Sequence, residues 1–261
     1  MNKFVIIAVT SLCFTLTAQA QISNADIKKK PSNEVTLFRD GLFKLMADYY
    51  QGKKVNNHAM GGVMLLHGCN GSRKNNSQLA TLLNKSGLFV LNVDLRGYGA
   101  SQGGGFSLSK IRRNAKNIKS YKNAFAALNS YWAKDSLKAF EWLRKKVDRS
   151  KQIAIVSFGC SATQAVAVAE KMRVNSLVIV TPKMDYSAKE RYKNLIDTPT
   201  YFISALQDVD SYNSAHELFE WSGSRFTKMQ IFKGNIVSHS LLRHHRGLTE
   251  DISNWLQQNL N

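Results

Sequence analysis

Acidic residues are scarce in this chain of 261 residues, which has 18 aspartates and glutamates against 36 lysines and arginines. The resulting charge of +18 is concentrated at residues 110–122 and 144–151. Such an excess favours anionic partners, such as an acidic cell surface or lipid head groups. The alternative is a solvated basic face without a specific partner. Nucleic acid is not expected as a partner, because the chain shows no nucleic-acid-binding motif.

Long hydrophobic runs are also missing, since no stretch after the first residues reaches the roughly 18 apolar residues of a membrane-spanning helix. The beginning of the chain is different. Lys3 precedes an apolar run at residues 4–17, and a small-x-small site follows at residues 18–20. This order predicts a signal peptide over residues 1–20 and an exported protein, periplasmic or secreted, with no transmembrane segment after cleavage. An uncleaved anchor is the alternative.

Cysteine is rare, with three residues, of which Cys13 lies in the predicted signal peptide. The mature chain keeps Cys69 and Cys160, and two cysteines of an exported protein can pair because the compartment is oxidising. Neither a C-x-x-C motif nor a His/Cys cluster at metal spacing occurs, so we expect no structural zinc and no cofactor.

The rest of the sequence predicts one α/β domain over residues 34–261, after a polar, flexible lead-in at residues 21–33. Apolar runs alternate with helical patterns, which predicts a mostly parallel, eight-stranded sheet with helices on both faces and an antiparallel edge. Strands are expected at residues 34–39, 42–50, 62–66, 88–94, 153–156, 176–180, 200–204 and 229–232. Helices are expected at residues 76–86, 131–147, 163–172, 187–196, 211–221 and 249–260.

One long irregular stretch, residues 97–129, interrupts this alternation. It contains three consecutive glycines and the first basic cluster. Loops or partly helical insertions of this length are usually functional. We expect it to lie over the end of the sheet where open α/β folds bind ligands.

The chemistry of the chain depends on residues 152–170, QIAIVSFGCSATQAVAVAE. An apolar run meets a group of small residues and then a helical Ala/Val segment, which is the order of a strand, a sharp turn and a helix. In the nucleophile elbow G-x-S-x-G, small residues flank the nucleophile because the turn is strained. Here the seat of the nucleophile falls on Gly159, which has no side chain to attack with. Cys160 stands one place later.

Taken in order, these pieces resemble the α/β-hydrolase superfamily, and more narrowly its dienelactone-hydrolase-like branch. The resemblance covers residues 34–260. It is carried by VMLLHGCNG at residues 63–71, DLRGYGAS at residues 94–101, the helix before the elbow, an aspartate after a later strand and a histidine after the last strand.

The resemblance assigns roles to these positions. Residues His67, Gly68 and Cys69 belong to the expected oxyanion loop, whose backbone N–H groups would stabilise a developing negative oxygen. Asp208 is the expected triad acid, with Asp210 as runner-up. His239 is the expected general base. The implied activity is hydrolysis of a small-molecule ester, lactone or thioester.

Three interpretations of the elbow stay open. In the first, the turn is shifted by one residue and Cys160 is the nucleophile of a Cys-His-Asp mechanism, activated by His239. In the second, Gly159 fills the seat, and Ser161 or a water carries out slower chemistry. In the third, the protein has no reaction and keeps its pocket for binding.

A disulfide between Cys69 and Cys160 is a further hypothesis that follows from the resemblance. If Gly159 fills the seat, the family pattern puts the N–H groups of both cysteines at one oxyanion hole. Two such residues can meet the Cα separation of roughly 4.4–6.8 Å that a disulfide needs. The bond would leave no free thiol that could act as a nucleophile.

Overall fold

The computed structural model describes residues 33–54 and 60–260. The chain divides into two units, Met1–Pro31 and Ser32–Asn261, and the second contains the whole described part. The predicted signal peptide, and all of the predicted lead-in except Asn33, lie outside the described residues. Within the described residues, no helix has the length and apolar character needed to span a bilayer.

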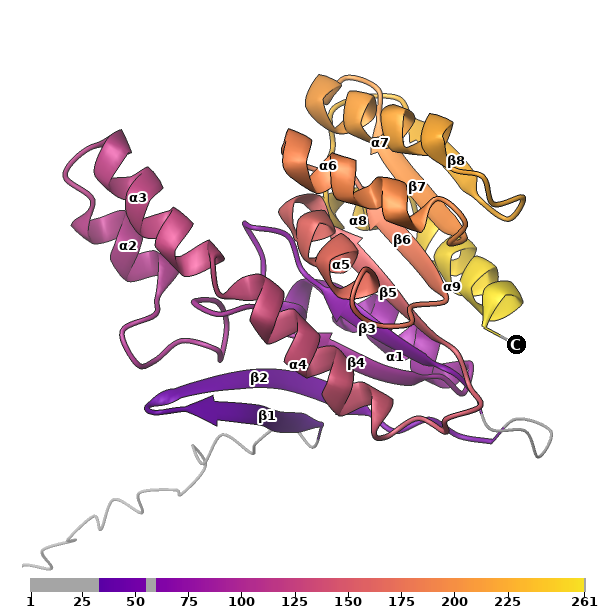
Figure 1. Cartoon of the computed structure of the whole chain (residues 1–261), viewed down its shortest axis with the longest axis horizontal. Coiled ribbons are helices and arrows are strands. Elements are labelled where there is room, and N and C mark those ends of the chain that lie inside the picture. The colour runs from indigo at the N-terminus through magenta and orange to yellow at the C-terminus, as the bar shows by residue number, and fades with distance from the viewer. Residues whose placement is uncertain (1–32, 55–59, 261) are drawn as a thin grey trace, which may run out of the picture. The chain divides into compact units, whose positions relative to one another are not determined.

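The strands of the described part form one eight-stranded sheet in the order β1-β2-β4-β3-β5-β6-β7-β8 (Figure 1). Strands β3 to β8 run parallel, whereas β2 is antiparallel to both β1 and β4. The predicted mostly parallel sheet with an antiparallel edge is therefore confirmed. The strands are β1 (Glu34–Asp40), β2 (Phe43–Tyr50), β3 (Gly62–Leu66), β4 (Phe89–Val93), β5 (Ile153–Phe158), β6 (Ser176–Val180), β7 (Thr200–Ala205) and β8 (Lys228–Phe232).

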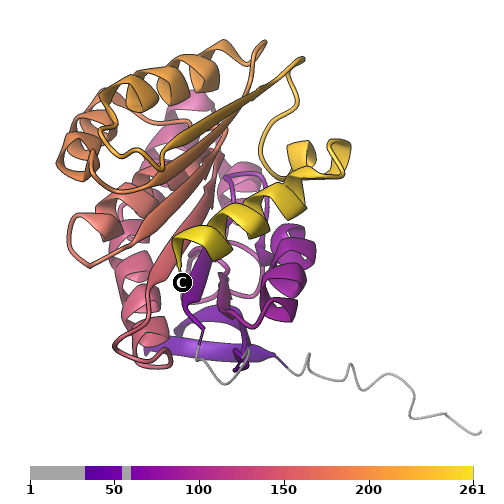
Figure 2. The ribbon, with the colours of Figure 1, turned by 90° about the vertical axis from the view of Figure 1, so that its right-hand side faces the viewer.

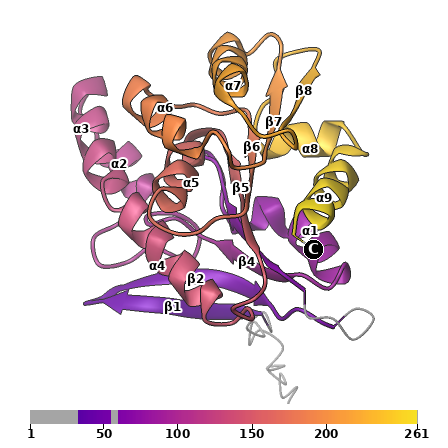
Figure 3. The same ribbon diagram turned by 45° about the vertical axis from the view of Figure 1, so that its right-hand side comes forward.

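Helices cover both faces of this sheet, as predicted (Figures 2 and 3). Helices α4 to α7 lie on one face, and α1, α8 and α9 lie on the other. The helices are α1 (Ser77–Lys85), α2 (Leu108–Asn114), α3 (Ile118–Asn129), α4 (Trp132–Arg144), α5 (Ala162–Ala169), α6 (Tyr186–Tyr192), α7 (Val209–Trp221), α8 (His239–His244) and α9 (Leu248–Asn259). Short 3₁₀ turns occur at Arg73–Asn76, Gly159–Ser161 and Lys193–Leu195.

The alternation of side chains along the central strands builds two hydrophobic cores. Met64 and Leu66 of β3 point into the core beneath α4 and α5, whereas Val63 and Leu65 point into the core beneath α1 and α9. All four are fully buried. Continuous apolar runs are typical of parallel strands covered on both faces, because neither side meets water. This packing fixes the strand ends from which the loops of the site emerge.

The irregular stretch at residues 97–129 is a loop followed by α2 and α3. These two helices extend away from the sheet as an arm (Figures 1 and 3). Leu108 and Leu128 fasten the arm to the core, where both are buried. Helix α8 was not predicted, because its six residues are too few to show a hydrophobic period and include only two apolar side chains.

Candidate active site

The predicted site residues all lie in the segments that follow the carboxyl ends of the parallel strands. The segment from His67 to Cys69 follows β3, and Gly159 and Cys160 follow β5. Asp208 follows β7, and His239 begins the helix that comes after β8. In open α/β sheets ligands bind at this edge, so the topology gathers these residues at the end of the sheet where a site is expected.

Gly159 has the backbone of a nucleophile seat. Its φ angle is +58°, in the left-handed region that the sharp strand-to-helix turn of an elbow requires. A Cβ built on this residue would meet no atom within 4 Å beyond its chain neighbours. The seat is therefore formed by the backbone, open in front, and without a nucleophilic side chain.

The hydroxyl of Ser161 is used to hold the turn together. Ser161 is fully buried, and its Oγ accepts the N–H of Phe158 at 3.0 Å. The same oxygen lies 2.9 Å from the carbonyl of Leu66, to which it donates, and 3.1 Å from the carbonyl of Phe158. A buried hydroxyl engaged in this way ties β5 to β3 and does not face a ligand, so the geometry offers no support for Ser161 as a nucleophile.

Cys69 and Cys160 are joined by a disulfide, with their Cα atoms 5.8 Å apart. The bond connects the loops after β3 and β5, which are neighbouring parallel strands. Both cysteines are half-buried. Because a thiolate is the attacking form of cysteine, this oxidised structure has no nucleophile at residue 160.

His67 holds the oxyanion loop in place. Its ring is buried, with Nε2 accepting the N–H of Leu95 at 3.0 Å and Nδ1 donating to the carbonyl of Gly68 at 2.8 Å. Burial lowers the pKa of His67 below its ordinary value of 6.5, because a charged imidazolium would be desolvated there. A neutral ring that bonds through both nitrogens is a positioning group for the loop.

The loop that carries His239 packs closely against the oxyanion loop. The backbone N–H of Ser238 donates to Thr181 Oγ1 at 2.9 Å. A Cβ added to Gly68 would stand 2.7 Å from Ser238 Oγ and 3.2 Å from the carbonyl oxygen of Phe158, so a larger residue here would displace a neighbour. His239 is half-buried, and burial followed by the nearby charge of Arg243 lowers the pKa of its imidazole. The structure thus brings His239 beside the expected oxyanion loop.

Asp208 is not connected to His239. Within residues 33–54 and 60–260, no hydrogen bond joins the two side chains. Asp208 Oδ1 instead lies 3.8 Å from the ammonium of Lys183, and its Oδ2 is buried without a partner in the described part. Lys183 also donates its backbone N–H to the carbonyl of Gly159 at 3.1 Å. The runner-up Asp210 is exposed in the first turn of α7.

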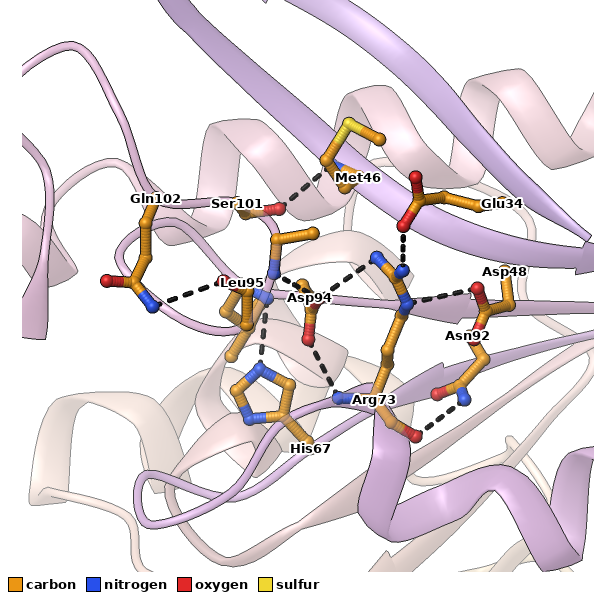
Figure 4. Close-up of polar contacts among 12 residues, drawn as sticks. Glu34, Met46, Asp48, His67, Arg73, Asn92, Asp94, Leu95, Ser101 and Gln102 are labelled. Atoms are coloured by element: carbon orange, nitrogen blue, oxygen red, sulfur yellow. Dashed lines mark hydrogen bonds and ion pairs between the residues drawn. The ribbon is translucent and has the colours of Figure 1, made fainter. Parts of the chain in front are cut away.

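A buried ionic cluster supports the loops after β3 and β4 (Figure 4). It was not predicted from the sequence. Its centre is Arg73, which forms ion pairs with three carboxylates, those of Glu34, Asp48 and Asp94. Asp94 also accepts the backbone N–H of Arg73 at 2.8 Å. Figure 4 shows the guanidinium of Arg73 between these acids, next to the His67–Leu95 contact. The cluster fixes the loops after β3 and β4 to each other.

A groove of about 550 Å³ lies next to the disulfide. Its walls come from the oxyanion loop (residues 69–71), the loop after β4 (residues 97–99 and Gln102) and helix α2 with Arg112 and Arg113. The phenol of Tyr98 donates to the carbonyl of Cys69 at 2.8 Å. Arg112 reaches across to Asn70 Oδ1 at 3.1 Å. In the described part no aspartate or glutamate lines the groove, and no cluster of His, Cys, Asp or Glu suits a metal ion.

Comparison with known proteins agrees with this architecture. Three solved structures superpose over most of both chains, at identities that show a shared fold alone. A dienelactone hydrolase from Anabaena variabilis has 17% identity and a TM-score of 0.63, covering 87% of this chain and 97% of its own. An esterase from Pyrococcus furiosus has 14% identity and a TM-score of 0.60, covering 87% and 90%. The protein Est1E from Butyrivibrio proteoclasticus, with ferulic acid bound, has 16% identity and a TM-score of 0.59, covering 86% and 98%.

Sequence comparison found no matching curated protein. A family model described as the alpha/beta hydrolase fold, however, matches residues 62–261. The match spans the parallel part of the sheet and every predicted site residue. The chain therefore belongs to the alpha/beta hydrolase fold family.

Proposed function

We propose that this protein is a non-catalytic member of its family that uses the groove beside the Cys69–Cys160 disulfide to bind a small carboxylic acid or acyl compound. The observation that carries the proposal is Gly159, which occupies the nucleophile seat with a φ of +58°. Covalent acyl transfer requires a side chain that attacks the carbonyl carbon. The seat has none, so hydrolysis by this route has no first step.

The neighbouring candidates do not replace the missing nucleophile. The sulfur of Cys160 is bonded to Cys69, and the hydroxyl of Ser161 is buried in the turn. A reduced Cys160 would be the nucleophile of the competing hydrolase hypothesis. It would stand one residue beyond the seat, where the family places the backbone N–H that serves the oxyanion. The disulfide thus supports the binding hypothesis.

The groove suits an anionic ligand. Arg112 and Arg113 line it, and no aspartate or glutamate is among its described lining residues. Arginine binds carboxylates with two parallel hydrogen bonds. One of the proteins with the same fold was solved with ferulic acid, a carboxylic acid. Small aromatic and short-chain carboxylic acids are therefore the first ligands to test.

We also propose that the mature protein works outside the cytoplasm, in the periplasm or as a secreted protein. Two features support this location. The sequence begins with a signal-peptide pattern. A Cys69–Cys160 disulfide persists in oxidising compartments and is kept reduced in most cytosols.

The turnover of p-nitrophenyl acetate and butyrate tests whether the protein is an enzyme. We expect the unreduced wild type to match His239→Ala and Cys160→Ala, all at the rate of the uncatalysed reaction, and we expect the same after reduction. A wild-type rate that falls at least about tenfold in either variant would overturn the proposal. Activity that appears only after reduction and disappears in Cys160→Ala would establish the thiol hydrolase.

Calorimetric titration with ferulic acid and with butyrate tests the binding function. Replacing one bidentate arginine removes roughly 1.5–3 kcal/mol, so Arg112→Gln should bind at least about tenfold more weakly. Arg149→Gln is the matched control, because Arg149 is exposed and is not among the residues that line the groove. Equal affinity in Arg112→Gln and wild type, or no binding of either acid, would contradict the proposed ligand class.

A further inference from the structure

The arm formed by α2 and α3 is a strongly basic surface with no acid of its own. Neither aspartate nor glutamate occurs between Asp94 and Asp135. Four lysines of the arm, Lys110, Lys116, Lys119 and Lys122, are exposed. In the described part of the chain, none of the four forms an ion pair. Their charges therefore add to one another without compensation.

The arm leaves its four lysines accessible to a partner. Figure 1 shows α2 and α3 standing away from the sheet. The inner side of the arm is held by aromatic contacts, since the ring of Phe125 lies 5.9 Å from that of Tyr121 and 5.7 Å from that of Trp132. The arm is thus attached to the core at its base, and its lysines face solvent.

The tip of the arm also carries an exposed apolar residue. Ile118, the first residue of α3, is 75% exposed. It falls at helical spacing from Tyr121 and Phe125, so the apolar face of α3 continues outward beyond the packed core. Lys116 and Lys119 flank it in the sequence. An exposed aliphatic residue among cations is a feature of segments that bind at a lipid interface, where the apolar group enters the head-group region.

From these observations we propose that the α2–α3 arm docks the protein onto an anionic lipid surface. The lysines would lie against the head groups, and Ile118 would enter the boundary with the acyl chains. The four lysines and Ile118 lie outside the groove lining, so this contact is separate from ligand binding. An acidic macromolecule would satisfy the lysines but would leave the exposed isoleucine without a role.

Binding to sedimented vesicles tests the proposal. The measurement compares vesicles of 30% phosphatidylglycerol in phosphatidylcholine with vesicles of phosphatidylcholine alone, at 0.15 M salt. If the apolar run at residues 4–17 is still present, it binds both kinds of vesicle. The ratio of the two affinities therefore measures the electrostatic contribution to binding. We expect wild type to prefer the anionic vesicles by at least about tenfold, because each basic residue near such a surface contributes about 1 kcal/mol.

The key variant is the quadruple substitution K110Q/K116Q/K119Q/K122Q, which leaves the arginines of the groove in place. We expect it to lose the preference for anionic vesicles. The matched control, K145Q/R149Q/K171Q/K233Q, removes the same charge from exposed positions outside the arm and should keep most of the preference. Ile118→Ser should weaken binding severalfold while the salt dependence stays the same, because a buried apolar side chain contributes without charge. Thermal unfolding verifies that each variant is folded.

Three results would overturn the proposal. An equal loss in the arm variant and in its control would mean that total charge, and not the arm, attracts the protein. Equal binding of wild type to both kinds of vesicle would exclude recognition of anionic lipid. Binding of wild type to soluble polyglutamate, with no binding to vesicles, would identify an acidic macromolecule as the partner. Because the lysines tested lie outside the groove lining, failure here leaves the proposed carboxylate binding untouched.

Discussion

The loops at the carboxyl ends of the parallel strands form two halves of the candidate site, which differ in how their polar groups are paired. In the half formed by the loops after β3 and β4, Arg73 forms ion pairs with three acids, and the His67 ring bonds through both nitrogens. In the half formed by the loops after β5, β7 and β8, Gly159 has no side chain and Asp208 is not connected to His239. The parts that shape the pocket are complete, and the parts that would perform chemistry are not. This difference supports the binding function proposed above.

Removing Arg73 should break the complete half. Arg73→Ala leaves three carboxylates around a vacated buried position, and loss of one member of a buried ionic cluster typically costs about 3–5 kcal/mol. Urea unfolding measures this loss. The matched substitution in the other half is Lys183→Ala, which removes an exposed partner of Asp208 and should cost less than about 1 kcal/mol. Similar losses in the two variants would contradict the comparison.

The disulfide connects the two halves, and its removal should be the next largest effect. Cys69 and Cys160 are separated by 91 positions, and closing a loop of this length lowers the entropy of the unfolded chain by an amount worth roughly 2–4 kcal/mol. The double variant C69S/C160S should unfold at correspondingly lower urea. Each single variant should lose about as much as the double, because either one removes the whole bond. Additive losses would show that the cysteines act separately.

Two glycines with positive φ sharpen the comparison. Gly99, in the complete half, has a φ of +48°, and a Cβ there would stand 2.2 Å from Asp94 Oδ2, which the guanidinium of Arg73 holds in place. Gly159 has a similar φ but open space around it. Gly159→Ala should cost about 1–2 kcal/mol from backbone strain alone, and Gly99→Ala should cost about 2 kcal/mol more because of the clash. Unfolding midpoints of the two variants measure the difference, and equal midpoints would refute it.

The pH dependence of stability is the smallest of these effects. Because burial lowers the pKa of His67 below 6.5, the unfolded chain takes up a proton on this ring at a higher pH than the folded chain does. The stabilising contribution is full above about pH 6.5 and is lost as the pH falls toward the folded value, by at most about 1.4 kcal/mol per pH unit.

Urea titrations between pH 7.5 and 5 should show a shallower pH dependence in His67→Gln than in wild type. His239→Gln is the comparison from the incomplete half, where burial also lowers the pKa but leaves the ring half-exposed. We expect the smaller change in slope from this second variant. A larger change in slope from His239→Gln than from His67→Gln would contradict the conclusion that His67 makes the larger contribution to the pH dependence of stability.

The sheet could be predicted from the sequence because its strands are buried apolar runs. The predicted bounds of β3 and β6 agree with the structure at both ends. The helices of the arm were not located within residues 97–129, because lysines and arginines stand among the apolar residues of α2 and α3. The Gly159 seat was recognisable from the small residues around it, and the structure supplies its positive φ.

Other features of the site depend on contacts between distant segments, which sequence patterns do not report. Arg73 follows the HGCNG motif and resembles an ordinary surface cation until β1, β2 and β4 bring their three acids around it. Asp208 and His239 stand in the expected order along the chain. Whether they meet is decided by the loops after β7 and β8, and the position of Lys183 beside Asp208 is visible only in three dimensions.

The position of the disulfide also determines what a protease can do to this protein. The exposed α2–α3 arm lies wholly between Cys69 and Cys160 in the chain, and exposed segments of this kind are preferred sites of cleavage. A cut in the arm would leave two fragments that remain covalently joined. The nicked molecule would keep both sides of its sheet together and would separate into two pieces only on reduction.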